Sequence, residues 1–181
     1  MANKILLDDI PYRKIELEDA TYFNEKKVGR TKTSNTKSGF SGYGQIPNYK
    51  FATVLKTTAK TGIIKQFNMH LANNKYESIT FRLNLYKVKD GKVQYRLNNE
   101  AIEFAIGNHK GWVGQSLEEY DIPVQGEVLV VLESIKSTGK KSALFFSLSP
   151  TFRMHRPFNK DNKHYVDDLW ENSFAWNFTM K

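Results

Sequence analysis

Apolar and polar side chains alternate with a period of two along much of this 181-residue chain. The pattern is clearest in the segment from Ile79 to Val88. Its odd positions up to residue 85 are apolar, and its even positions up to residue 84 are polar: Ile79, Phe81, Leu83 and Leu85 against Thr80, Arg82 and Asn84. Because a β-strand points successive side chains to opposite faces, the alternation is typical of a strand that lies between a core and water. Asp90-Gly91 follows directly and predicts a tight hairpin turn.

The same signal recurs along the chain, with turn residues between the apolar segments. Further strands are expected over 63–71, with Ile63, Phe67, Met69 and Leu71 facing the core, and over 102–106 and 174–180. Residues 128–135 are apolar at nearly every position, which predicts a central strand that is covered on both faces. One helical turn is expected near residues 116–120. The sequence therefore predicts an all-β, antiparallel, jelly-roll-like β-sandwich.

Residues 26–48 have a different composition from the rest of the chain. The segment KKVGRTKTSNTKSGFSGYGQIPN is rich in glycine, hydroxyl side chains and lysine, and it contains no acidic residue. Such a composition is typical of a loop or connector. We expect a short N-terminal arm and a Gly/Ser/Lys-rich connector over 1–48, and the β-sandwich domain over 49–181.

The composition also excludes several kinds of chemistry. The chain has no cysteine, so it has no disulfide, thiolate metal site or cysteine nucleophile. No apolar run approaches the roughly 18 residues that span a bilayer, and neither a nucleophile elbow nor a Walker loop is present. We expect a protein without catalytic activity or a cofactor. It would be cytoplasmic if Met1 is the native start, and periplasmic or envelope-associated if the chain is a fragment of a longer precursor.

The histidines point to an alternative function, that of a hydrolase. His155 and His164 lie near Asp167, and two imidazoles with a carboxylate are a set of ligands that zinc accepts. Their spacing matches no metal-binding template, so we expect no metal site. A hydrolase with its site in the sandwich loops is the hypothesis that these residues leave open.

The chain is basic, with a formal net charge of +8. Its positive side chains gather in a candidate basic patch, which consists of Lys26, Lys27, Arg30, Lys32, Lys37, Lys140 and Lys141. A cationic surface with exposed aromatic rings binds single-stranded nucleic acid through its phosphates and bases. A basic nucleic-acid-binding domain is therefore the first alternative function.

The aromatic segment near the C-terminus favours a different ligand. It holds residues of the kinds that line a sugar site, namely Trp170, Tyr165, His155, Arg156, Asn162 and Asn172. The opposing interpretation is that the tryptophans Trp112, Trp170 and Trp176 fill the core. Trp176 lies in the apolar register of its strand and is expected to be buried. Trp170 lies in a polar loop and is the better exposed candidate.

Three stretches of the sequence resemble a known family. They are FNMHLANNKYESITFRLNLYKVKDGK, GWVGQSLEEYDIPVQGEVLVVLESIKSTGK and the closing SFAWNFTMK. Together with the Gly-rich segment before them, they resemble a module of the Bacteroidetes carboxypeptidase-like regulatory domain-containing proteins, over roughly residues 26–181. Ser134 stands where the family pattern often has tryptophan. The resemblance implies a jelly-roll-like sandwich at the bacterial envelope. With no catalytic motif in the chain, we expect a binding or interaction module for a glycan or a protein partner.

Overall fold

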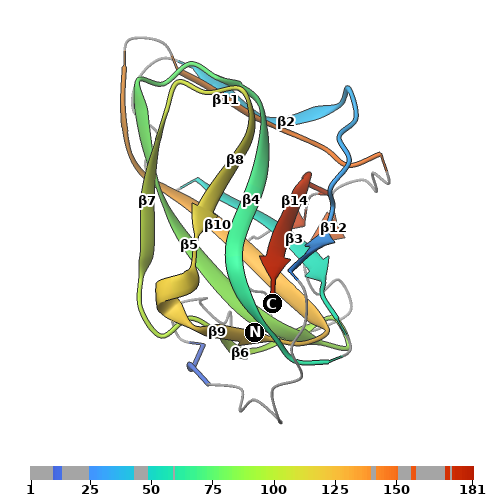
Figure 1. Ribbon diagram of the computed structural model, residues 1–181. Coiled ribbons are helices and arrows are strands. Elements are labelled where there is room, and N and C mark those ends of the chain that lie inside the picture. Colours follow the sequence, from blue (N-terminus) through green and yellow to red (C-terminus); the bar gives the residue numbers. More distant parts are fainter. Residues whose placement is uncertain are drawn as a thin grey trace, which may run out of the picture.

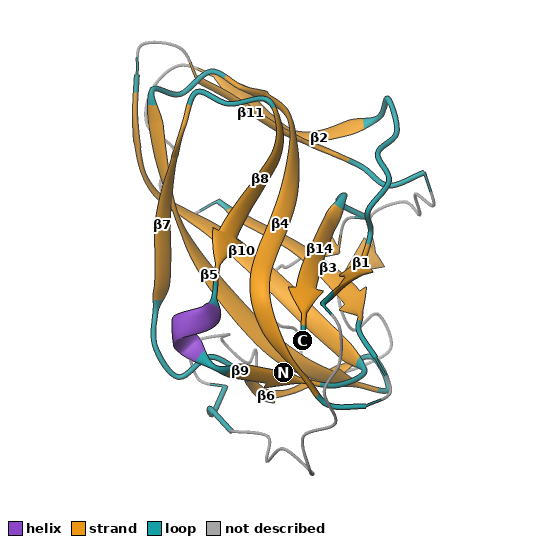
Figure 2. Cartoon of the chain, in the orientation of Figure 1, coloured by secondary structure: helices purple, strands orange, loops and turns teal. Residues whose placement is uncertain are grey.

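Two β-sheets pack face to face and enclose one main core (Figure 1). The computed structural model describes residues 10–13, 25–42, 49–58, 60–139, 142–150, 156–157, 170–171 and 173–181. This architecture confirms the expected all-β, jelly-roll-like sandwich. The one helical element in these ranges is the 3₁₀ turn η2 (Glu118–Tyr120), which lies where the sequence predicts a single turn (Figure 2). Within the described part of the chain, no helix has the length and apolarity to cross a membrane.

The first sheet is built around β4, and we call it the β4 sheet. Its strands are β1 (Lys26–Gly29), β2 (Lys37–Gly42), β4 (Gly62–Asn74), β8 (Gly111–Ser116), β9 (Ile122–Val124), β11 (Ser142–Ser147) and β14 (Trp176–Met180). β14 and β11 pair with β4 along one edge, and β9 and β8 pair with it along the other. β1 then borders β14, and β2 borders β11.

The second sheet is built around β10, and we call it the β10 sheet. Its strands are β3 (Lys50–Lys56), β5 (Ser78–Lys89), β6 (Lys92–Arg96), β7 (Ile102–Gly107), β10 (Glu127–Thr138), β12 (Arg156–Pro157) and β13 (Trp170–Glu171). The order is β12-β13-β3-β10-β5-β6, with β7 beside the first half of β5. Asp90 and Gly91 both have positive φ and form the predicted turn between β5 and β6.

Aromatic side chains from both sheets meet in the core. Phe146 of the β4 sheet packs against Phe51 and Phe81 of the β10 sheet, with ring centroids 4.8 and 6.4 Å apart. Trp176 is fully buried, as its register predicts, and meets Phe67 edge-on at 5.5 Å. Because buried rings remove a large apolar area from water, this cluster is a principal source of the sandwich's stability.

β10 is buried on both faces, which confirms the expected central strand. Val128, Val130 and Leu132 join the main core, whereas Leu129 and Val131 join a second apolar cluster on the outside of the β10 sheet. Ile10, Ala52, Tyr86 and Val88 complete that second cluster. The chain near Ile10 is held there by two backbone hydrogen bonds between residues 11–13 and residue 96, at the end of β6. A part of the N-terminal arm therefore docks on the sandwich.

The start of β4 differs from the sequence prediction. Ile64 is fully buried, whereas Ile63, which the alternation assigns to the core, is only partly buried. The pairing with β14 explains the difference, because Ile64 and Gln66 lie opposite consecutive residues of β14 and Lys65 is extra. This bulge shifts the in-and-out alternation by one position. The expectation that Ile63 faces the core is therefore wrong.

The Gly-rich segment contributes two strands to the β4 sheet, although its composition predicts a connector. β1 and β2 both lie within residues 26–48 and pair antiparallel with β14 and β11. Gly39 shows why the prediction fails. A Cβ at this position would overlap with the backbone oxygen of Leu144 on the neighbouring strand, so this glycine allows a close approach between strands rather than a turn. The domain boundary at residue 48 remains a prediction.

Adjacent phenylalanines on β11 give a test of this packing. Phe146→Ala should lower the free energy of unfolding by about 3–5 kcal/mol, because it empties a fully buried site. Phe145→Ala should lower the free energy of unfolding by about 1 kcal/mol or less, because Phe145 faces outward and the Lys37 ammonium lies over its ring. Urea denaturation of both variants measures the difference. Equal losses would contradict the register of β11.

Candidate functional site

Four side chains form a row across the outer face of the β4 sheet, which we call the Trp112 row. Trp112 lies opposite His70 in the β8–β4 pairing, and Ser147 lies opposite Lys37 in the β11–β2 pairing. The Ser147 hydroxyl and the His70 Nδ1 join the two halves with a hydrogen bond of 2.8 Å. Because neighbouring strands lie about 4.8 Å apart, the row spans about 14 Å.

The register of the core points these four residues outward. His70 lies between the fully buried Met69 and Leu71, and Ser147 lies between Phe146 and Leu148, which are also buried. Successive side chains of a strand alternate between faces, so each residue between two core residues faces away from the core. The aromatic and polar row is therefore fixed by the same strands that build the hydrophobic interior.

Trp112 is the exposed end of the row, with 41% of its surface accessible. Its ring meets the His70 imidazole edge-on, with centroids 5.2 Å apart. His70 is in turn held by Ser147, and the backbone oxygen of Trp112 contacts the ring of His109. An exposed indole that packs against a side chain of the neighbouring strand is partly ordered before any ligand arrives.

A network of amide and hydroxyl side chains lies next to the Trp112 row, on the same side of the β4 sheet. The Asn68 amide donates to the Asn177 Oδ1 at 3.1 Å and to the Thr179 hydroxyl at 3.2 Å. Asn177 also donates to the backbone oxygen of Arg30. These contacts link β4 to β14 and to the chain just after β1, so the polar network belongs to the framework of the sheet.

Gln66 supplies an amide without a partner within the described residues. Gly114 lies opposite Asn68, and a Cβ at this position would overlap with the Gln66 amide nitrogen. The missing side chain of Gly114 therefore lets the Gln66 amide lie over β8, two residues along the strand from Trp112. No described residue bonds to this partly buried amide, which can both donate and accept hydrogen bonds.

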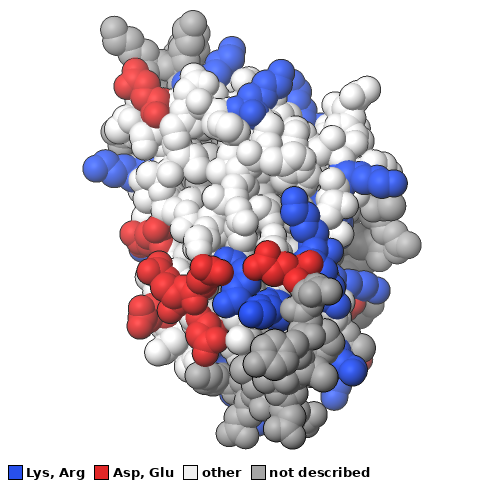
Figure 3. All heavy atoms as spheres, viewed as in Figure 1, with Lys and Arg blue, Asp and Glu red and all other residues white. Residues whose placement is uncertain are grey.

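The middle of this face carries few charges. Figure 3 shows uncharged residues over β4 and β8, with basic side chains toward the edges and acidic side chains gathered at the lower left. His70 is also neutral near pH 7, because burial, and secondarily the positive charge of Lys110, lower the pKa of its imidazole. The protein is strongly basic, yet this surface is mostly polar and uncharged.

Most residues of the predicted sugar site lie outside the described part of the chain. Tyr165, His155, Asn162 and Asn172 are not described. Trp170 and Arg156 are placed through their backbones, which pair Trp170 of β13 with Pro157 and Arg156 of β12 with Glu171, at the edge of the β10 sheet. This sugar site therefore stays a prediction. The hydrolase hypothesis also stays a prediction, because His155, His164 and Asp167 lie outside the described residues.

The structure separates the members of the predicted basic patch. Lys27 and Lys37 lie on β1 and β2, and their strand partners Thr179 and Ser147 belong to the outer face of the β4 sheet. The Arg30 Nη1 instead donates to the Thr53 hydroxyl at 2.5 Å and to the Val54 backbone oxygen at 2.9 Å. Arg30 therefore ties the chain after β1 to β3. Lys140 and Lys141 lie outside the described residues.

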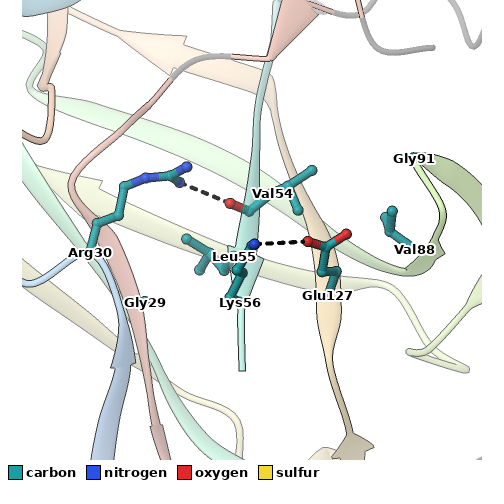
Figure 4. Close-up of a pocket in the computed structure, with 8 residues that line it drawn as sticks. All are labelled: Gly29, Arg30, Val54, Leu55, Lys56, Val88, Gly91 and Glu127. Carbon is teal, nitrogen blue, oxygen red and sulfur yellow. Dashed lines mark hydrogen bonds and ion pairs between the residues drawn. The ribbon is translucent and has the colours of Figure 1, made fainter. Parts of the chain in front are cut away.

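An open cleft of about 380 Å³ is the second candidate surface. Figure 4 shows its lining, which consists of Gly29, Arg30, Val54, Leu55, Lys56, Val88, Gly91 and Glu127. Lys56 and Glu127 lie 3.5 Å apart as an exposed ion pair, and Arg30 reaches the Val54 backbone. These charged groups contact one another or the backbone, and the rest of the lining is mainly apolar. The Gln66 amide beside the Trp112 row has no such partner among the described residues, so the outer face of the β4 sheet is the stronger candidate.

Metal binding finds no support in the residues that can be placed. Among the described parts of the chain, no group of three or more histidine, aspartate or glutamate side chains is arranged to hold an ion. The outer face of the β4 sheet offers the indole of Trp112, the partly buried imidazole of His70 and the amide of Gln66, whereas Asn68, Asn177 and Ser147 are buried. Such groups bind a ligand through hydrogen bonds and ring contacts.

Comparison with known proteins yields one distant likeness in structure. No family model and no curated protein matches the sequence. The crystal structure of the cysteine protease and lectin-like domains of Cwp84, a surface layer associated protein of Clostridium difficile, aligns with a TM-score of 0.42 and 11% sequence identity. The alignment covers 83% of this chain and 37% of that chain, so it spans little more than a third of that protein's structure. At this TM-score, the likeness carries no inference about function.

The pKa of His70 tests the arrangement around Trp112. An NMR titration should place it below 6.5, and Lys110→Ala should raise it toward that value while burial keeps it lower. Because the unfolded chain then binds a proton that the folded chain does not, His70 should favour unfolding as the pH falls through 6.5. The variant His70→Gln assigns the resonance. An unchanged pKa in Lys110→Ala would place Lys110 away from the row.

Proposed function

We propose that the chain is a non-catalytic binding module that recognises a glycan on the outer face of the β4 sheet. The observation that carries the proposal is the exposed indole of Trp112, which is ordered by His70 beside a largely uncharged polar surface. A sugar ring has an apolar face of C–H groups and a rim of hydroxyls. Trp112 suits the first, and the Gln66 amide beside it suits the second.

The polar groups beside Trp112 match what sugar hydroxyls require. A hydroxyl both donates and accepts hydrogen bonds, and the Gln66 amide offers both functions close to the indole. Asn68 is 8% exposed and bonds to Asn177 and Thr179, so it holds the strands beneath this surface rather than a ligand. A ligand that lacks the matching hydroxyl would leave the Gln66 amide unpaired, so this amide would discriminate between ligands.

The order of the site before binding also supports a recognition role. A long flexible side chain loses about 0.5–1.5 kcal/mol of conformational entropy when a ligand immobilises it. Trp112 has only two side-chain torsions, and its ring already contacts His70. Little further ordering is needed when a sugar stacks on it, which suits a module that must bind single sugar units with small contact areas.

Family membership and an envelope location are further proposals, and both rest on the sequence resemblance over residues 26–181. A module of that family would work on glycans or proteins at the cell surface, which agrees with a binding role. Fractionation of the source cells with an antibody against this chain tests the location. Recovery in the cytoplasm would remove the envelope proposal and leave the glycan proposal intact.

Substitution of Trp112 tests the function directly. Trp112→Ala should weaken glycan binding at least tenfold, which corresponds to about 1.4 kcal/mol, whereas Trp112→Phe should keep part of the affinity because it keeps a ring. Tyr49→Ala is the matched control, since Tyr49 is also exposed, at 53%, but precedes β3 in the other sheet. A glycan array followed by isothermal titration calorimetry measures these effects.

Two outcomes would contradict the proposal. One is glycan binding that survives Trp112→Ala and is lost in a variant of Trp170, which would move the site to the C-terminal segment. The other is an absence of glycan binding together with a salt-dependent mobility shift of single-stranded DNA, which would favour the nucleic-acid alternative. Circular dichroism of Trp112→Ala checks that the fold is retained, as expected for an exposed side chain.

A further inference from the structure

We infer that two copies of this chain pair through the outer edges of their β8 strands, antiparallel and centred on Gly114, and so join their β4 sheets into one. The inference goes beyond the proposed function, because it names the partner of this strand edge and its measurement needs no glycan. It is carried by the direction of the β8 backbone groups, the absence of charge on the strand, the charges that flank it and the amide of Gln66.

The backbone of β8 has hydrogen-bonding groups at its outer edge. The Leu117 N–H, directly after the strand, donates to the backbone oxygen of Lys65 on β4. Alternate residues of an antiparallel strand direct their N–H and C=O groups to the same side, so those of Trp112, Gly114 and Ser116 point away from β4. In the part of the chain that the structure describes, no other strand pairs with β8. These groups are therefore placed to bond to a further strand.

The contacts of two carbonyl groups agree with this direction. The Trp112 oxygen lies 3.2 Å from the His109 Nε2, and the Ser116 oxygen accepts from the Gln115 side chain at 3.0 Å. A carbonyl oxygen has two lone pairs, so each can accept a second hydrogen bond from an incoming strand. Gly114, between them, is exposed, and no described residue bonds to its backbone at this edge.

The β8 strand lacks the features that keep sheet edges from pairing. Its sequence GWVGQS contains no charged residue and no proline. An exposed edge of this kind is a template for another strand, and proteins protect most edges with lysine, proline or a bulge. The other free edges among the described strands have such residues: Lys26 and Lys27 of β1, Lys37 of β2, Lys92 and Arg96 of β6, Glu103 of β7, Pro123 of β9 and Arg156 of β12.

The charges that flank β8 favour a second copy of the same chain and select the register. Lys110 and Glu118 lie just outside the strand, at equal distances in sequence before and after Gly114. Both are exposed, and neither forms an ion pair with a described residue. In an antiparallel pair centred on Gly114, Lys110 of each copy lies beside Glu118 of the other. The next registers that match the edge groups place Lys110 beside Ser116 or Tyr120 instead, without an ion pair.

The Gln66 amide supplies a polar centre for this interface. It lies over Gly114, where a Cβ would overlap with its nitrogen, and no described residue bonds to it. The two-fold axis of the pair passes between the two Gly114 residues, whose Cα atoms would lie about 5.5 Å apart. The two Gln66 amides would therefore face each other across the axis, where each can donate to the other. Any side chain at position 114 would displace the amide from this place.

The pairing also extends the candidate binding surface. Residues that lie opposite each other in a sheet point to the same face, so the Trp112 side chains of both copies lie on one side of the joined sheet. Trp112 of one copy lies beside Ser116 of the other, and Gln66 of that copy follows on its β4. If the proposed function holds, a long glycan meets two indoles at once, which raises its apparent affinity without a new kind of contact.

Analytical ultracentrifugation of the full chain without glycan tests the dimer. The pairing covers one short strand on each copy, so we expect a weak dimer. The average mass should rise from 21.0 kDa toward twice this value between about 10 μM and about 1 mM protein. Hydrogen exchange at the amides of Gly114 and Ser116 should slow over the same range. The amide of Leu117, which is bonded within one copy, should not change.

Charge reversal tests the register. Lys110→Glu and Glu118→Lys should each weaken dimerisation about tenfold, because each replaces two attractive contacts by two repulsive ones. The double variant should return the dissociation constant to within about twofold of the original. Lys92→Glu is the matched control, because it makes the same change of charge at an exposed position of the β6 edge and should alter dimerisation less than twofold. Circular dichroism checks that each variant is folded.

The possible results separate this inference from the proposed function. A chain that stays monomeric over the whole range overturns the inference, and so does a dimer that tolerates both single reversals. Single reversals that weaken the dimer without restoration in the double variant also overturn it, because they would show an effect of net charge. Dimerisation with restoration in a protein that binds no glycan supports the inference and removes the proposed function. Glycan binding by a strict monomer does the reverse.

Discussion

The pairing of β4 along both of its edges is the constraint on which the rest of the β4 sheet depends. Four strands bond to β4, and their registers decide which of its side chains face inward. Phe67, Met69 and Leu71 enter the core, so Asn68 and His70 must face outward. A shift of one residue would bury the polar set and expose the apolar one. Packing of the interior therefore holds the candidate binding surface in place.

The alternation of the sequence was sufficient to predict the fold class and several strand faces. Ile79, Phe81 and Leu83 are buried as expected, and β10 is covered on both sides. The failures have local causes. A bulge at Lys65 reverses the alternation at the start of β4, and Gly39 is a point of close strand contact although glycine more often marks a turn. Both effects depend on a neighbouring strand, which a single segment of sequence does not display.

The candidate site was harder to predict than the fold. In the segment GWVGQS, glycines flank the two apolar residues, so no period can be recognised. One signal was available, because Trp112 and Val113 are adjacent and cannot both face the core from one strand. Val113 packs against the core and Trp112 is exposed. His70, Ser147 and Lys37 come from three other strands, and only the registers between these strands show that they form one row.

The second apolar cluster has a consequence for the behaviour of the protein in solution. Ile10 covers part of a surface that Tyr86, Leu129 and Val131 would otherwise present to water. A contiguous apolar patch on a sheet promotes self-association. A fragment that begins at residue 49 would keep the core strands β3 to β14 and lose this cover, along with β1 and β2. Such a fragment would expose an apolar patch on the outer face of the β10 sheet and unpaired strand edges in the β4 sheet, and it would tend to self-associate. Residues 10–13 therefore protect the face of the sandwich that lies opposite the candidate binding surface.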